Sequence, residues 1–306
     1  MEERAIPVEG NPMTPGSATA ADCPVCGATG SHSGEKKGFH LYRCGRCGLL
    51  FLWPMPDNTL AIYSGDYFTG AKNGFGYVDY DRDKAVMKPT FEHYLQIIQE
   101  YRRPPGELLD VGAATGYFVG LANAAGWQAY GIEPSDEAVQ IATAKGLAVR
   151  NGILTQDTYP PASFDVVTLW DVLEHIPEPH GILSTVYRIL KPGGVAVFNT
   201  PDSGSLWART MGLRWHLIVP PEHVNLFSGK SLRVALEKHR FKVRDERRIG
   251  KTFTIQYVMQ TLAHWQDLGI WHSMSNMLQG RRIGKLGIPI NLYDNMFVLA
   301  TKPEVS

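Results

Sequence analysis

The sequence predicts an α/β fold with a largely parallel sheet, preceded by a small module that a metal ion holds together. An apolar run ending in an acid leads into a glycine-bracketed turn over residues 108–118, and a helix-like pattern follows the turn. Three further apolar runs of strand length end near residues 132, 170 and 200, with helix-like segments between them, as in an α/β sheet. All four cysteines occur in two Cys-x-x-Cys pairs, which indicates the metal-held module.

Length and charge limit the class of protein. The 306 residues suffice for one large domain with an appendage or for two domains. Lys plus Arg and Asp plus Glu number 30 each, so no overall basic field would attract nucleic acid. Residues 1–20 contain Pro, Gly and Ser without an apolar run, which predicts a disordered leader and not a signal peptide. With no apolar run long enough to cross a membrane, we expect a cytoplasmic protein.

The cysteine pairs predict a structural zinc site. Cys23 and Cys26 are separated by seventeen residues from Cys44 and Cys47, a spacing typical of a four-cysteine zinc ribbon. The alternative is two disulfides or a redox pair, which a reducing cytosol disfavours. Four thiolate ligands leave no open coordination position, so we expect residues 21–56 to form a ribbon with a structural zinc ion.

The ribbon has a weak nucleic-acid signature. Residues 21–56 contain four Lys or Arg side chains and two Asp or Glu side chains, a net charge of plus two. An RNA reader needs a stronger basic patch than this. The apolar run over residues 49–56 instead favours a structural cap that packs against the next element, and nucleic acid is disfavoured as a partner.

Residues 57–103 are predicted to hold an aromatic segment and then a helix. Tyr and Phe are frequent between residues 57 and 82, which suits either a lid over a ligand or a cover for the core. Phe91, Tyr94, Leu95 and Ile98 then recur on one face of a helix, and Pro104-Pro105-Gly106 ends it.

The glycine turn disfavours a dinucleotide. Its glycines are Gly112 and Gly116, and Ala114 occupies the middle position where a pyrophosphate would need close backbone approach. Asp110, two residues before the turn, suits a cationic amine or a water. A second strand ends in Glu133, placed to accept hydrogen bonds from both ribose hydroxyls. An amine and a ribose without a pyrophosphate indicate S-adenosylmethionine (SAM).

Four motifs in order resemble those of the class I SAM-dependent methyltransferases. They are Asp110–Gly116, Gly131–Ser135, Phe164–Ile176 and Leu190–Gly194. The resemblance covers roughly 105–245 and is greatest to the ubiquinone-pathway O-methyltransferase-like branch. It implies a Rossmann-like sheet with an antiparallel last strand, in a SAM-binding domain over 104–306. It also implies a set of cofactor-binding residues: Asp110, Gly112, Ala114, Gly116, Tyr117, Glu133, Pro134, Ile153, Leu154, Trp170 and Asp171.

An acid-x-x-Glu-His run follows the fourth strand. Asp171, Glu174 and His175 stand at helical spacings i, i+3 and i+4, so all three are expected to face one point. In relatives such a run, with a later histidine, binds a divalent cation that orients the acceptor hydroxyl. Here Asp171, Glu174, His175 and His223 are either such a site, for Mg²⁺, or a structural cluster near the cofactor.

The best candidates for a base are Glu222 and His223. Two prolines precede them and limit their conformations near the carboxyl edge of the sheet. Because the ordinary pKa of imidazole lies near neutral pH, His223 is the first candidate for the general base. A purely structural histidine is the alternative.

The last strand pair is expected at 241–249 and 295–301, with an insertion over 252–290 between them. The insertion has an amphipathic helix carrying Val258, Leu262 and Trp265, then Trp271, Met274 and Met277. This stripe predicts a substrate-pocket wall, a homodimer face, a membrane-surface contact or plain core packing.

These features predict an O-methyltransferase acting on a small molecule, a sugar or a glycan. An alcohol or phenol acceptor needs a base or a metal, which Glu222, His223 and the acid-x-x-Glu-His run offer. C- or N-methylation of a sugar nucleotide or natural product, an RNA methyltransferase using the ribbon, and a non-catalytic SAM-binding scaffold are the alternatives.

Overall fold

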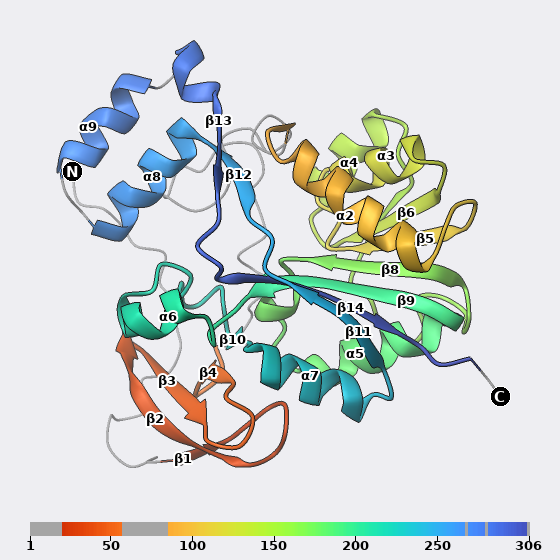
Figure 1. The fold of residues 1–306 in the computed structure, drawn as a ribbon, viewed down its shortest axis with the longest axis horizontal. Coiled ribbons are helices and arrows are strands. Elements are labelled where there is room, and N and C mark those ends of the chain that lie inside the picture. Colours follow the sequence, from red (N-terminus) through yellow and green to blue (C-terminus); the bar gives the residue numbers. More distant parts are fainter. Residues whose placement is uncertain (1–19, 57–84, 267–268, 279–280, 305–306) are drawn as a thin grey trace.

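In a computed structural model, seven strands form the central sheet (Figure 1). The structure describes residues 20–56, 85–266, 269–278 and 281–304; the predicted leader and the aromatic part of the predicted lid lie outside these ranges, except for residue 20. The sheet order is β11-β14-β9-β8-β5-β6-β7. The strands are β5 (Glu107–Val111), β6 (Gln128–Glu133), β7 (Val149–Asn151), β8 (Phe164–Trp170), β9 (Leu190–Pro201), β11 (Lys242–Arg247) and β14 (Asn295–Thr301).

The last strand pair confirms the predicted sheet. β14 runs antiparallel to both β9 and β11, while β5, β6, β7, β8 and β9 pair in parallel. Buried side chains alternate between the two faces of each strand, so that Val166 and Val167 belong to different apolar clusters.

Helices cover both faces of the sheet. One cluster joins the sheet to α2 (Lys88–Tyr101), α3 (Tyr117–Ala124) and α4 (Asp136–Ala144). The other joins it to α5 (Pro179–Ile189) and α7 (Gly229–Lys238). The α2 helix buries Phe91, Tyr94, Leu95 and Ile98, as the sequence predicts. Ser135 and Ser228 cap α4 and α7 with their side chains, because a serine oxygen satisfies an otherwise unpaired N–H of the first turn.

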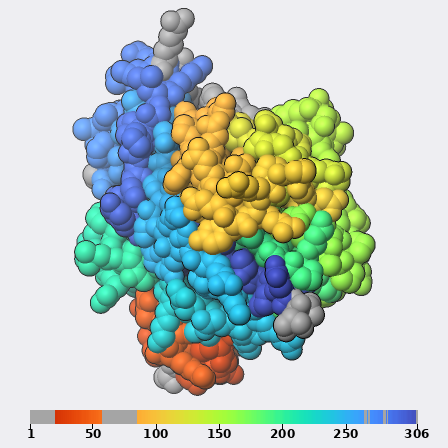
Figure 2. Space-filling view, turned by 45° about the vertical axis from the view of Figure 1, so that its right-hand side comes forward, coloured from red at the N-terminus to blue at the C-terminus, as the bar shows by residue number. Residues whose placement is uncertain are grey.

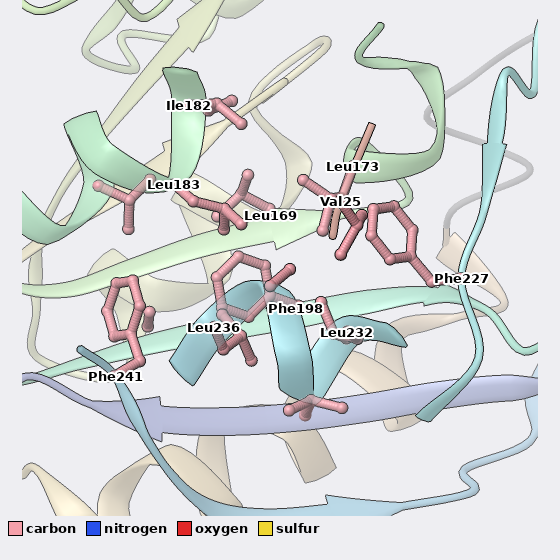
Figure 3. Close-up of a cluster of buried hydrophobic side chains, with 14 of the residues drawn as sticks. Val25, Leu169, Leu173, Ile182, Leu183, Phe198, Phe227, Leu232, Leu236 and Phe241 are labelled. Carbon is pink, nitrogen blue, oxygen red and sulfur yellow. The ribbon is translucent and has the colours of Figure 1, made fainter. Parts of the chain in front are cut away.

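The ribbon is built into the core. Its strands β1 (Ala20–Asp22), β2 (Thr29–Lys36), β3 (Phe39–Cys44) and β4 (Leu50–Leu52) form a sheet that β10 (Asn225–Leu226) completes. Phe51 pairs with Asn225, and Leu50 with Leu226. Val25, fully buried, lies beside Leu173 and Phe227 in the cluster under α7 (Figure 3). The ribbon and the sheet therefore share one hydrophobic core.

The insertion lies beyond the carboxyl ends of the central strands, at the opposite end of the molecule from the ribbon (Figures 1 and 2). It begins with β12 (Lys251–Thr254), which pairs with β13 (Gly287–Ile290). Between these strands come α8 (Ile255–Gln266), α9 (Gly269–Leu278) and the short helix η4 (Arg282–Lys285). The proposed homodimer contact through residues 252–290 stays a prediction.

Three short elements complete the fold near the ribbon: η2 (Leu173–His175), α6 (Leu206–Met211) and η3 (Gly212–Arg214). Within the described ranges, no helix combines the length and apolar character needed to span a bilayer.

Candidate active site

A cavity of about 1420 Å³ opens at the carboxyl ends of the parallel strands. Its floor includes Val111, Glu133, Trp170 and Pro201, which are at or near the last positions of β5, β6, β8 and β9. Its walls come from the insertion and from the tip of the β2–β3 hairpin of the ribbon. Open α/β sheets bind ligands at this edge, so the cavity is the candidate active site.

The glycine turn after β5 has no room for larger residues. Gly112 has a φ of 72°, and a Cβ atom there would lie 2.6 Å from Cγ2 of Val172. Gly116 has a φ of 77°, and its Cβ atom would lie 2.8 Å from Leu147. Ala114, between them, also adopts positive φ. The turn thus presents backbone, and not side chains, to the cavity at Gly112.

Glu133 ties the turn to the end of β6. Its Oε2 atom accepts a hydrogen bond from the Ala114 N–H at 2.9 Å, and Oε1 accepts one from the Ser135 N–H at 3.0 Å. Burial raises the pKa of Glu133, while these two hydrogen bonds oppose the rise. Each carboxylate oxygen retains a second lone pair, and Glu133 lines the cavity.

Most of the other predicted cofactor-binding residues also line this end of the cavity. They are Pro134, Ile153, Leu154, Trp170 and Asp171, together with Gly112 and Ala114. Asp110, Gly116 and Tyr117 are absent from the lining: Asp110 is buried and accepts a hydrogen bond from the Thr168 hydroxyl at 2.7 Å. Trp170 stacks on Tyr94, with ring centroids 4.8 Å apart.

Asp171 has a different role from the one its spacing predicts. The expectation that Asp171, Glu174 and His175 share one turn of helix is wrong, because Asp171 has a φ of 53° and η2 begins only at Leu173. The Asp171 carboxylate accepts hydrogen bonds from Lys251 at 2.6 and 2.7 Å. This ion pair joins the end of β8 to the start of the insertion.

Glu174, His175 and His223 form a compact donor cluster. One ligand atom from each of the three lies within 4.8 Å of the other two. His175 Nδ1 lies 2.9 Å from the Glu222 carbonyl oxygen, and His223 Nδ1 lies 2.7 Å from the Leu217 carbonyl oxygen. A carbonyl only accepts, so each Nδ1 atom carries a proton and donates it to its carbonyl.

The buried carboxyl of Glu174 completes this cluster. Its Oε2 accepts a hydrogen bond from the Thr200 hydroxyl at 2.9 Å, whereas its buried Oε1 has no hydrogen-bond partner among the described residues. Burial and the negative charge of Asp171 raise the pKa of Glu174 to about 8. Burial lowers the pKa of His175 to about 4, and burial with the nearby His175 lowers that of His223 to about 3. Each of these shifts favours the neutral form of its group.

Comparison with known proteins assigns the fold to a family. A family model described as a methyltransferase domain matches residues 83–246, more than half of the chain. The chain belongs to the methyltransferase domain family. The glycine turn, Glu133 and the Glu174 cluster all lie within or close to the matched region, and the predicted resemblance to SAM-dependent methyltransferases is confirmed.

Relatives of this methyltransferase include O-methyltransferases. It is 27% identical over 209 residues to a malonyl-[acyl-carrier protein] O-methyltransferase of Serratia marcescens, covering 67% of this chain and 77% of the relative. It is 32% identical over 101 residues to a ubiquinone biosynthesis O-methyltransferase of Thiobacillus denitrificans, where the match covers 31% of this chain and only 44% of the relative. A solved putative methyltransferase of Bacillus halodurans shares the fold, with 16% identity, a TM-score of 0.53 and coverage of 70% of this chain and 99% of the other.

The four cysteines of the methyltransferase fit a tetrahedral metal site. All four are free thiols, and their sulfur atoms lie within 4.8 Å of one another. The Cys23 and Cys47 sulfurs are 3.6 Å apart, and those of Cys26 and Cys44 are 3.4 Å apart. Zinc bound at about 2.3 Å by four thiolates would place the sulfurs roughly 3.8 Å apart. This donor set suits a structural zinc ion.

Sequence reasoning missed three lysines of the site. Lys251 belongs to no recognisable motif, and only the fold brings it to Asp171. Lys36 and Lys37 belong to the ribbon and line the cavity, whereas the sequence-based prediction used them only in the net charge of residues 21–56. The turn signal at Lys37-Gly38 could have placed them at a hairpin tip, but nothing in the sequence says which surface that tip meets.

Proposed function

We propose that this methyltransferase transfers a methyl group from SAM to a hydroxyl of a small molecule or glycan. The observation that carries the proposal is the Glu174, His175 and His223 cluster, which lines the same cavity as Glu133. Two imidazoles, each held by a carbonyl at its Nδ1 atom and close to a buried carboxyl, suit the binding of an acceptor hydroxyl or of a cation that activates it.

The proposed SAM site is the end of the cavity formed by β5 and β6. The ribose hydroxyls would donate to the remaining lone pairs of Glu133, and the adenine would pack against Ile153 and Leu154. Gly112 and Ala114 leave space for the amino-acid part of the cofactor. Asp110, Gly116 and Tyr117 would act by holding the shape of the turn.

Methyl transfer from a sulfonium is an in-line displacement, in which the nucleophilic oxygen approaches the methyl carbon to about 3 Å. The neutral His223 would accept a hydrogen bond from the acceptor hydroxyl at Nε2. Glu222 is the better final proton acceptor, because burial raises its pKa to about 7, near the operating pH. We therefore assign orientation of the hydroxyl and first uptake of its proton to His223, and final acceptance of that proton from His223 to Glu222.

The same cluster fits a divalent cation. Glu174, His175 and His223 would hold it, each histidine being fixed by a carbonyl on its Nδ1 atom. Two imidazoles and one carboxylate favour zinc, iron or manganese over the Mg²⁺ that the sequence suggests, since Mg²⁺ prefers oxygen ligands. When bound, the cation would lower the pKa of the acceptor hydroxyl. Asp171, already paired with Lys251, would not be a ligand.

The test is transfer of labelled methyl from SAM into a lysate separated into RNA, protein, glycan and small-molecule fractions. We expect label in the glycan or small-molecule fraction, and its loss in His223→Ala but not in the exposed control His93→Ala. Label in RNA, or full turnover by His223→Ala on the identified acceptor, would contradict the proposal. Chelation with EDTA, after confirming that the cysteine-bound metal remains, reports whether the cluster uses a cation.

A further inference from the structure

The tip of the β2–β3 hairpin reaches from the ribbon into the active-site cavity. Lys36 and Lys37 both line that cavity, although they belong to the ribbon. Lys36 pairs with Phe39, so the hairpin loop consists of Lys37 and Gly38 alone. Figure 1 shows this end of the hairpin beside α6.

The backbone at the tip is unusual for a lysine. Lys37 and Gly38 have φ values of 51° and 80°, as a two-residue hairpin turn requires, and these positions favour Asn, Asp or Gly. A lysine in the left-handed region costs roughly 1 kcal/mol. Residues with a strained backbone of this kind concentrate at functional sites, and here such a residue lines the active-site cavity.

Two contacts fix the hairpin in this position. At Gly34 a Cβ atom would lie 2.4 Å from Cδ1 of Leu213 in η3, so only glycine allows β2 to approach so closely. The Lys36 ammonium donates a hydrogen bond to the Trp215 carbonyl at 3.0 Å. The Trp215 indole N–H in turn donates to Asp294 at 2.9 Å. The tip is thus held against the wall of the cavity, and the Lys36 ammonium is fixed there.

Lys36 is partly buried at this end of the cavity, and the exposed Lys37 adds a second positive charge beside it. Burial and the adjacent charge of Lys37 lower the pKa of Lys36 to about 8. Lys36 also lowers the pKa of the neighbouring His216, whose pKa falls mainly through burial. Burial raises the pKa of Glu222, and the positive charge of Lys37 opposes this rise. Adjacent cations in a site of reduced solvation are stabilised by a bound anion.

We propose that Lys36 and Lys37 bind a phosphate group of the methyl acceptor. The proposal rests on the proposed function and narrows its substrate class to phosphorylated acceptors. Lysine ammoniums are common phosphate ligands, and the phosphate carries close to two negative charges at neutral pH. The cavity of about 1420 Å³ exceeds the roughly 300–1,000 Å³ of an ordinary ligand site, so it has room for both cofactor and acceptor.

The test is calorimetric titration of pyrophosphate into the full chain saturated with S-adenosylhomocysteine. We expect binding on the order of 1 mM, weakened about tenfold for each lysine replaced in Lys36→Met and Lys37→Met. Lys242→Met, at an exposed lysine on β11, is the matched control and should bind as the wild type does. Malonate, a dicarboxylate, should bind more weakly than pyrophosphate.

Several results would overturn the proposal. They are no pyrophosphate binding, equal loss in the Lys242→Met control, or equal or tighter binding of malonate. S-adenosylhomocysteine affinity, measured on each variant, separates the two proposals. If the wild type does not bind S-adenosylhomocysteine, the proposed cofactor site is refuted. If it binds S-adenosylhomocysteine but not pyrophosphate, only the proposed phosphate site is refuted. If Lys36→Met fails to fold, Lys37→Met alone decides, because the Lys37 side chain is exposed.

Discussion

Truncation of Val25 tests whether the ribbon and the methyltransferase sheet form one cooperative unit. Val25 is fully buried between the first cysteine pair and the cluster of Leu173, Phe227 and Leu232. Val25→Ala removes two methyl groups, each worth about 0.8 kcal/mol of burial. The cavity left behind adds to this loss, so we expect the free energy of unfolding to fall by about 2–3 kcal/mol.

The assay is urea denaturation followed by two signals, tryptophan fluorescence for the core and metal release to a chromogenic chelator for the ribbon. In a shared core, both transitions should coincide in the wild type and move together to lower urea in Val25→Ala. Val234→Ala, at a half-buried position of α7, should move them less. Separate transitions, or a shift of the metal signal alone, would refute the shared core.

Two further predictions concern the turn and the sheet. Gly112→Ala should weaken S-adenosylhomocysteine binding by at least about tenfold, because a Cβ atom would strain the turn by about 1–2 kcal/mol and meet Val172. Calorimetry measures this affinity. Gly120→Ala is the control and should bind normally, because a Cβ atom there has ordinary contacts. Asp165 is buried, which favours its neutral form, but hydrogen bonds from Lys191, the Glu107 N–H and Arg102 hold its pKa below the usual range. The ionised Asp165 therefore stabilises the fold above pH about 4, and this stabilisation is lost as the pH falls further. Asp165→Asn should lower the free energy of unfolding by about 1–3 kcal/mol at pH 7 and by less at pH 3. Equal losses at both pH values in urea denaturation would contradict this.

Local patterns predict the central sheet well. The run from Leu108 to Phe118 encodes a strand, a left-handed turn and a helix start through its own residues, and Ser135 and Ser228 mark helix starts by the same local chemistry. Continuous apolar runs also place β9 and β14. These elements depend on interactions within a few residues, which the sequence displays directly.

The site is less predictable where distant segments meet. Helical spacing places Asp171 with Glu174, but the left-handed backbone at Asp171 and its ion pair with Lys251, 80 residues later, override that spacing. In the sequence the ribbon resembles a separate module, because its four cysteines lie within 25 residues of one another. In the structure its strand β4 pairs with β10, which lies in the methyltransferase domain. Lys36 and Lys37 reach the cavity only because Gly34 lets the hairpin pack on η3. Each of these results from tertiary contacts that no local pattern encodes.

The pairing of β4 with β10 has a consequence for folding during synthesis. Phe51 leaves the ribosome 174 residues before its partner Asn225, a delay on the order of 10–35 s at typical elongation rates. During that time the β4 edge is unpaired, and unpaired edges promote association between chains. Early metal capture by the cysteine knuckles would hold the first four strands in place until β10 arrives. Supply of the metal to the nascent chain, and not only to the finished protein, would then determine how much of this methyltransferase reaches its native state.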